Sequence, residues 1–122
     1  MKRLVVIMLL GFSACSLDVD NPEESLCTQE FVYGLNVTVR DDKDNTIITE
    51  GITVIARNGD YAEELTVPEG LDIFIGAGER PGNYILEVTS DNYQPYISES
   101  IRVNADICHV IPRYIEILLS LN

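Results

Sequence analysis

Apolar and polar side chains alternate along much of the chain with a period of two residues. The segments 35–40 (LNVTVR) and 52–57 (ITVIAR) each place an apolar side chain at every second position. Because successive side chains of an extended backbone point to opposite faces, this alternation indicates strands that are buried on one side. Five further strands are expected where similar runs lie between turn-forming residues, at 61–67, 72–75, 83–89, 96–103 and 114–121.

Turn chemistry separates these runs at short intervals. Clusters of Asp, Asn, Ser, Gly or Pro stand at 41–45, 58–60, 81–82 and 90–92. Seven short strands in about 94 residues are typical of an antiparallel sandwich of two sheets. No segment after the first fifteen residues carries a convincing helical stripe of apolar side chains. The sequence therefore predicts an all-β fold, a seven-stranded antiparallel β-sandwich.

The first fourteen residues have the pattern of an export signal. Two basic residues precede an apolar run at 4–12, and the small residues Ser13 and Ala14 follow it. A run of nine residues is shorter than the roughly 20 residues that a helix needs to span a bilayer. We therefore expect a cleaved N-terminal signal helix at 1–14 rather than a permanent transmembrane helix.

A cysteine, Cys15, follows directly after these small residues. The stretch Phe12-Ser13-Ala14-Cys15 resembles the bacterial lipobox, in which the signal is cut before the cysteine. The resemblance implies that Cys15 becomes the acylated N-terminus and that the lipid bilayer is a partner of the protein. Several acyl chains on one residue hold a protein durably at a bilayer. The alternative is a plain signal peptide in which Cys15 has no special part.

The next segment, 16–26 (SLDVDNPEESL), has four acidic side chains, one proline and no apolar period. This composition predicts a solvated tether with a coil span of roughly 20 Å. The expected organisation is a signal at 1–14, a lipidated Cys15 with its acidic tether at 15–28, and one domain at 29–122. The acidic start resembles export signals of surface lipoproteins in Bacteroidetes-type bacteria. The expected location is the bacterial cell envelope, lipid-anchored, facing either the periplasm or the cell surface.

The charge balance limits the classes of partner and of activity. The chain has 122 residues, with 8 basic and 20 acidic side chains and a net charge of −12. Nucleic-acid binding depends on basic side chains that neutralise phosphates, so no nucleic-acid partner is expected. One histidine, three cysteines and no tryptophan leave little for catalysis, and no enzymatic activity is expected.

The cysteines predict a disulfide. If Cys15 is the lipid anchor, Cys27 and Cys108 remain as an even pair in an oxidising compartment. Closing a loop of about 80 residues would stabilise the fold by roughly 4 to 5 kcal/mol in the chain-entropy model. The alternative is two separate thiols. A metal site is not expected, because two cysteines and one histidine supply too few ligands at unsuitable spacing.

His109 follows Cys108, which invites a cysteine–histidine nucleophile as an interpretation. Adjacent side chains of an extended backbone face opposite ways, so direct contact is disfavoured and a structural or surface role is expected. An enzyme would need His109 beside a carboxylate in a buried polar cluster, and the sequence gives no sign of one.

One turn hints at calcium, because Asp41, Asp42 and Asp44 gather oxygen ligands. Counted from Asp42 as an EF-hand loop, position six is Ile47 instead of glycine and position twelve is Thr53 instead of glutamate. A solvated turn is therefore expected, without metal or cofactor, and an irregular calcium site stays open as the alternative.

The order of strands and turns resembles the carboxypeptidase regulatory-like domain, a transthyretin-like β-sandwich. The most specific stretch is 81–88 (PGNYILEV), in which proline fixes φ, glycine permits a left-handed turn and Tyr84 begins an inward-facing set. The resemblance implies a Greek-key, prealbumin-like fold with a non-catalytic accessory role. The other matching stretches are 35–41, 51–54, 92–93 and 115–119.

Tyrosines are the candidates for a recognition surface. Tyr93 and Tyr96 flank a turn with Pro95 and are the pair most suited to an exposed binding cluster, although core packing is the expected role of each. The leading hypothesis is a membrane-anchored envelope lipoprotein that acts as a non-enzymatic structural or protein-interaction module. The alternative is a surface module that binds a small ligand, peptide or glycan through these tyrosine-bearing loops.

Overall fold

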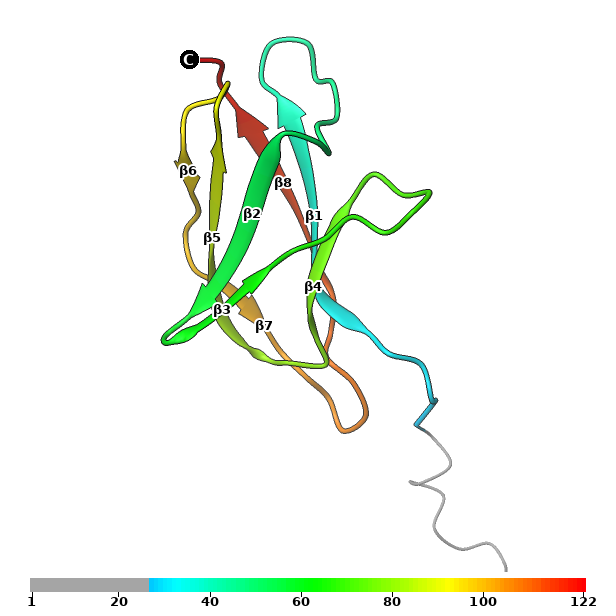
Figure 1. Ribbon diagram of the computed structural model, residues 1–122. Helices are drawn as coiled ribbons and strands as arrows, with labels where there is room; N and C mark the ends of the chain where they lie inside the picture. The colour runs from blue at the N-terminus through cyan, green and yellow to red at the C-terminus, as the bar shows by residue number, and fades with distance from the viewer. Residues whose placement is uncertain (1–26) are drawn as a thin grey trace, which may run out of the picture.

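The computed structural model describes residues 27–122, which form two packed β-sheets (Figure 1). The predicted all-β sandwich is confirmed for this part of the chain, and the signal helix predicted at 1–14 lies outside the described residues. The strands are β1 (Tyr33–Asp41), β2 (Ile52–Asn58), β3 (Tyr61–Glu64), β4 (Phe74–Gly78), β5 (Gly82–Ser90), β6 (Tyr96–Ile97), β7 (Ile101–Val103) and β8 (Arg113–Leu119).

The smaller sheet has the strand order β4-β1-β8, and the larger sheet has the order β3-β2-β5-β6. Strand β7 also pairs with β5. It lies along the first residues of β5, whereas β6 lies along later residues of the same strand. These pairs are antiparallel except for β1 with β8, which run parallel from Leu35 opposite Arg113 to Asp41 opposite Leu119. The order mixes strands from the two ends of the chain, so both sheets depend on contacts between distant residues.

The core lies between the sheets and is built from the alternating positions that the sequence indicates. In β5, Tyr84, Leu86 and Val88 are buried, and intervening residues such as Ile85 are exposed. Burying one such side chain contributes about 1.5 to 3 kcal/mol. Other strands contribute Leu35, Val37, Val39, Val54, Ala56, Phe74, Ala77, Ile101, Val103, Ile117 and Leu119.

One buried side chain of this core carries a polar group, and that group has hydrogen-bond partners within the protein. The Tyr84 side chain is fully buried, and its hydroxyl donates to the Arg80 carbonyl oxygen at 2.8 Å. The same hydroxyl accepts from Nη1 of Arg80 at 2.9 Å. A buried hydroxyl without partners would cost free energy, so Arg80 makes tyrosine tolerable at this position.

The strand expected at 96–103 is divided into β6 and β7, which gives eight strands in residues 27–122 instead of seven. The Ser98 amide donates to the Leu86 carbonyl at 2.9 Å, and the Ser98 hydroxyl oxygen accepts from the Leu86 amide at 2.8 Å. A side chain therefore takes the place of a backbone carbonyl in the ladder. The regular pairing stops there and resumes at Ile101.

The parallel pair of β1 and β8 departs from the expected antiparallel arrangement. Parallel neighbours need a long crossover connection. Here almost the whole domain lies between the two strands in sequence, and it passes through the larger sheet. The first and last strands can therefore lie side by side and start at the same end of the sandwich (Figure 1).

The two ends of the sandwich carry different parts of the chain. The N-terminal segment, defined as residues 27–32, and the β7–β8 loop, defined as residues 104–112, lie at one end, and the C-terminus lies at the other (Figure 1). Among residues 27–122 there is no helix long and apolar enough to cross a membrane.

Ser98→Ala tests the role of this side chain in the divided strand. The substitution leaves the Leu86 amide without its partner, so we expect a loss of about 1 to 3 kcal/mol in the free energy of unfolding. Urea unfolding measures the change. The control Ser100→Ala removes a hydroxyl from an exposed position of the same connection and should be nearly neutral; equal effects of the two substitutions would contradict the assignment.

Candidate functional site

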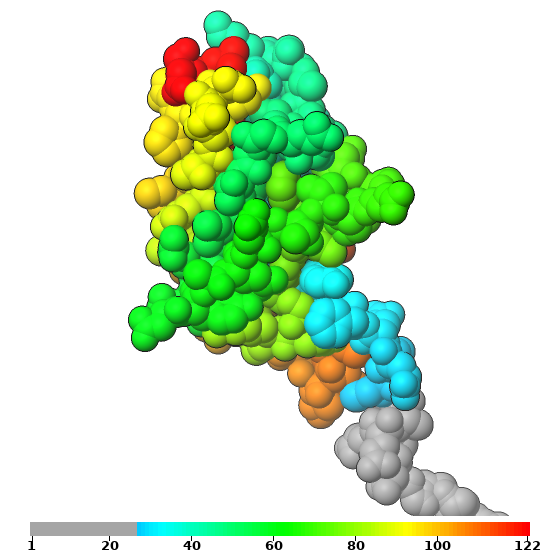
Figure 2. Space-filling model, viewed as in Figure 1, coloured from blue at the N-terminus to red at the C-terminus, as the bar shows by residue number. Residues whose placement is uncertain are grey.

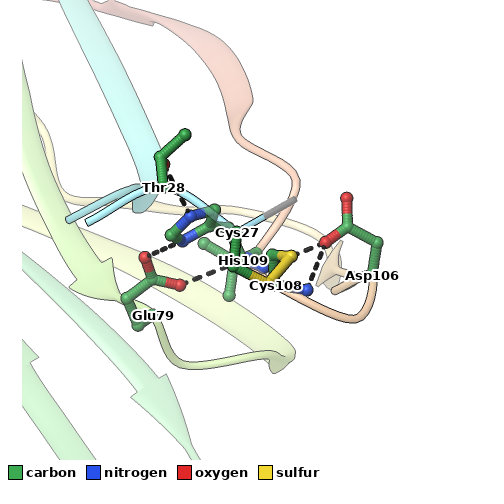
Figure 3. The surroundings of a disulfide bond; sticks show 7 residues. Cys27, Thr28, Glu79, Asp106, Cys108 and His109 are labelled. Carbon is green, nitrogen blue, oxygen red and sulfur yellow. Dashed lines mark hydrogen bonds and ion pairs between the residues drawn. A yellow bond between two sulfur atoms is a disulfide. The ribbon is translucent and has the colours of Figure 1, made fainter. Parts of the chain in front are cut away.

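A disulfide joins the N-terminal segment to the β7–β8 loop, which confirms the predicted pairing of Cys27 with Cys108 (Figure 3). The two residues are 81 positions apart in sequence and their Cα atoms are 5.2 Å apart. The disulfide therefore closes nearly the whole domain into one covalent loop.

The β7–β8 loop is held in shape around Cys108. Oδ1 of Asp106 accepts from the amides of Cys108 at 2.8 Å and His109 at 2.9 Å, and the Asp106 amide donates to the His109 carbonyl. An isolated bridge between Ala105 and Val110 closes the loop below this turn. The same amide donors favour the charged carboxylate and lower the pKa of Asp106.

His109 connects a carboxylate and a hydroxyl across this end of the molecule. Its Nδ1 lies 2.6 Å from Oε2 of Glu79, and its Nε2 lies 3.0 Å from Oγ1 of Thr28 (Figure 3). The hydrogen bond with Glu79 raises the pKa of His109 above its ordinary value of 6.5. In the protonated imidazole both nitrogens donate, which fits an acceptor on each side.

Glu79 is the centre of this arrangement, which we call the clasp: Thr28, His109 and Glu79 together with the disulfide. Its Oε2 accepts from the Val32 amide at 2.9 Å, its Oε1 accepts from the Val110 amide at 3.1 Å, and its own amide donates to the Val32 carbonyl. Burial raises the pKa of Glu79, but the hydrogen bonds from His109 and from the two backbone amides lower it by more than burial raises it. The net shift of the Glu79 pKa is therefore downward.

The backbone of Glu79 is also unusual, with φ at 48°. A residue with a side chain rarely adopts this left-handed conformation, which costs of the order of 1 kcal/mol or more. It places the carboxylate between the N-terminal segment and the β7–β8 loop. One side chain therefore ties three separate parts of the chain together.

The clasp contains the groups of a nucleophilic triad in order, a hydroxyl, an imidazole and a carboxylate. The sequence carries no sign of a carboxylate beside His109, and the structure places Glu79 there. Glu79 was missed because it lies 30 residues from His109 and directly after a short strand, where no periodicity marks it. Cys108 and His109 do not form a nucleophile pair: Cys108 bonds to Cys27, and His109 contacts Glu79.

The two tyrosines proposed for binding lie at the end of the sandwich opposite the clasp. The hydroxyl of one of them already makes a hydrogen bond within the protein. The Tyr93 hydroxyl donates to Oδ2 of Asp41 at 2.8 Å, which raises the pKa of Tyr93. Tyr93 and Tyr96 are half-buried and pack against the core. A small groove of about 100 Å³ lies beside Tyr96 and is lined by Pro95 and Leu118.

The carboxylates of the candidate calcium turn all accept hydrogen bonds from the protein. Oδ1 of Asp41 accepts from the Lys43 amide, Oδ1 of Asp44 accepts from Thr46, and Asp42 accepts from the Ser120 hydroxyl. The Lys43 amide and then the Tyr93 hydroxyl lower the pKa of Asp41. The described residues contain no group of three or more acidic, histidine or cysteine side chains suited to a metal ion.

A larger groove lies on the outer face of the smaller sheet and was not predicted. Its volume is about 340 Å³, and it is lined by Asn36 and Thr38 of β1, by Tyr114, Ile115 and Glu116 of β8, and by Ile73. Polar and aromatic side chains at outward positions of two neighbouring strands were the only signal in the sequence that could have indicated it.

No protein-family pattern matches this chain, and no curated protein matches it in sequence. Cys15 lies outside the described residues.

A variant with both disulfide cysteines replaced, Cys27→Ala/Cys108→Ala, measures the contribution of the covalent bond. We expect it to lose about 4 to 5 kcal/mol in the free energy of unfolding, because the unfolded chain regains the entropy of an 81-residue loop. Urea unfolding gives the value, and reduction of the wild-type protein should produce a similar loss. Two titratable thiols from Cys27 and Cys108 in denatured, unreduced protein would contradict the pairing.

The clasp predicts a specific pH dependence of stability. The raised pKa of His109 adds stability that is fully present below 6.5 and is lost as the pH rises through the raised value. The lowered pKa of Glu79 adds stability that is present above 4.5 and is lost as the pH falls through the lowered value. The clasp should therefore be strongest between pH 4.5 and pH 6.5.

His109→Gln tests this dependence, because glutamine keeps a hydrogen-bond donor but does not titrate. The difference in melting temperature between wild type and variant should be largest between pH 4.5 and pH 6.5 and should shrink in alkaline buffer. His109 is the only histidine, so no other imidazole contributes. A difference in melting temperature between the two proteins that stays unchanged from pH 6.5 into alkaline buffer would show that the ion pair adds nothing.

Proposed function

We propose that the protein is a lipid-anchored module of the bacterial cell envelope with a non-enzymatic, structural or protein-interaction role. The observation that carries this proposal is the Cys27–Cys108 disulfide. Disulfides of this kind belong to oxidising compartments, which fits export by the signal at 1–14. The pairing accounts for two of the three cysteines, and the third, Cys15, is the residue of the lipobox-like stretch.

The position of the disulfide suits a protein that is held at its N-terminal end. Cys27 is the twelfth residue after Cys15, and the clasp fixes it to the β7–β8 loop. A force applied through the anchor would therefore reach the covalent bond and the Glu79 contacts before it reached β1. We infer that a force on the anchor passes through the clasp directly to the body of the sandwich.

A structural role for the clasp fits better than catalysis. Both oxygens of Glu79 hold backbone amides in addition to His109, which ties the carboxylate to fold maintenance. Thr28 is exposed on the N-terminal segment and supplies a secondary hydroxyl. We propose that the hydroxyl–imidazole–carboxylate order serves to fasten this segment, and that the domain is of the carboxypeptidase regulatory-like kind, a module usually without catalysis.

Ligand binding is the second candidate function, favoured by the groove on the smaller sheet. Its volume of about 340 Å³ lies at the lower end of the range for small-molecule sites, about 300 to 1,000 Å³. Tyr114 supplies an aromatic surface there, and Asn36 and Glu116 supply polar groups. We place a small ligand or glycan in this groove rather than beside Tyr96, where the space of about 100 Å³ is too small for one.

The anchor is tested by the intact mass of protein extracted from bacterial membranes. We expect a chain that begins at Cys15 and carries added lipid, and Cys15→Ala should leave the membrane fraction. The matched control is Cys27→Ala/Cys108→Ala, which should keep the lipid because it leaves the signal unchanged. An unmodified secreted form of the wild-type protein would overturn the proposal.

A further inference from the structure

The end of the domain that carries the clasp exposes large apolar side chains. Ile107, in the β7–β8 loop, is 85% exposed, more than any other large apolar residue that the structure describes. Phe31, in the N-terminal segment, is 61% exposed, and Ile111, at the base of the loop, is 48% exposed. The N-terminal segment and the loop lie side by side at this end (Figure 2). We call Phe31, Ile107 and Ile111 the apolar tip.

The apolar tip is held firmly in place. Ile107 stands between Asp106, which caps the turn through two amides, and Cys108, which is bonded to Cys27. The Phe31 ring lies over Gly78, where any added Cβ would collide with it, and makes an edge-to-face contact with Tyr33 at 5.2 Å between ring centroids. Because the backbone on both sides of Ile107 and the ring of Phe31 are already fixed, docking costs less conformational entropy than it would for a mobile loop.

We propose that the apolar tip docks against the headgroup region of a zwitterionic bilayer, so that the domain rests on its membrane with the clasp facing the lipid. This proposal rests on the proposed anchor at Cys15. Apolar aromatic and aliphatic side chains at the boundary between headgroups and acyl chains are the usual contacts of proteins that lie on membranes. The tip is small, which suits a contact that adds orientation to an attachment made elsewhere.

The length of chain before the domain favours this occupant over others. Eleven residues separate Cys15 from Cys27, so even a fully extended connection keeps Cys27 within about 40 Å of the lipidated residue. The tip lies at the same end as Cys27. A tether of this length makes the encounter with the bilayer intramolecular, and a contact too weak for the free domain is then sufficient.

The charges near the tip decide which kind of bilayer it fits. Asp106 and Glu30 lie next to the apolar residues in sequence, and the segment 16–26 adds four acidic side chains. A strongly anionic surface would repel them, and a zwitterionic surface would not. Docking should therefore be weaker on vesicles that contain phosphatidylglycerol than on vesicles of phosphatidylcholine alone.

The test uses the mature chain 15–122 attached to vesicles at Cys15. Made without the signal 1–14, this chain is not acylated, and with the disulfide intact Cys15 carries its only free thiol, to which a maleimide lipid couples. A failure of docking is thereby distinguished from a failure of the anchor. The chain has no tryptophan, so Ile107→Trp introduces a single tryptophan as reporter. The matched control is Leu121→Trp, 52% exposed beside the C-terminus at the opposite end.

Brominated phosphatidylcholine in the vesicles should remove most of the tryptophan emission of Ile107→Trp and shift the remainder to shorter wavelength. Leu121→Trp should keep its emission. Quenching of neither tryptophan, or equal quenching of both, would overturn the proposal, and the first outcome would point to a protein partner for the tip. If Ile107→Trp lowers the melting temperature, Phe31→Trp replaces it with the same expected result, since Phe31 is also exposed and aromatic.

Discussion

The parallel pairing of β1 with β8 is the constraint on which the clasp depends. Parallel neighbours begin at the same end of a sheet, so the residues before β1 and the residues before β8 meet there. Cys27 then reaches Cys108, and Thr28 reaches His109. With β8 reversed in the sheet, the β7–β8 loop would lie at the opposite end, and neither contact would form.

The clasp and the two-sheet core divide the work of holding the domain together. The core buries the alternating side chains of the strands and sets the overall fold. The clasp fastens the N-terminal segment, which has no strand pairing of its own, through a covalent bond and the carboxylate of Glu79. At this end the disulfide, the charged groups of the clasp and the exposed apolar side chains come together, and the proposal that the domain rests on a membrane depends on that juxtaposition.

The local features of the fold could be predicted from the sequence, and the long-range ones could not. Alternation gave the buried faces of β1 and β5, because it depends only on neighbouring residues. The parallel partner of β1 and the break at Ser98 depend on which strands meet across the chain, and periodicity carries no such information. Cysteine count predicted the disulfide, whereas Glu79 was found only through its contacts with His109.

The most direct test of this account is the pattern of nuclear Overhauser contacts between β1 and β8 in the isotope-labelled mature protein. We predict amide-to-Hα contacts whose residue numbers increase together along both strands, with Val37 beside Ile115 and Val39 beside Ile117. Close Hα–Hα contacts whose numbers run in opposite directions would indicate an antiparallel pair. That result would separate Cys27 from Cys108 and would contradict the clasp.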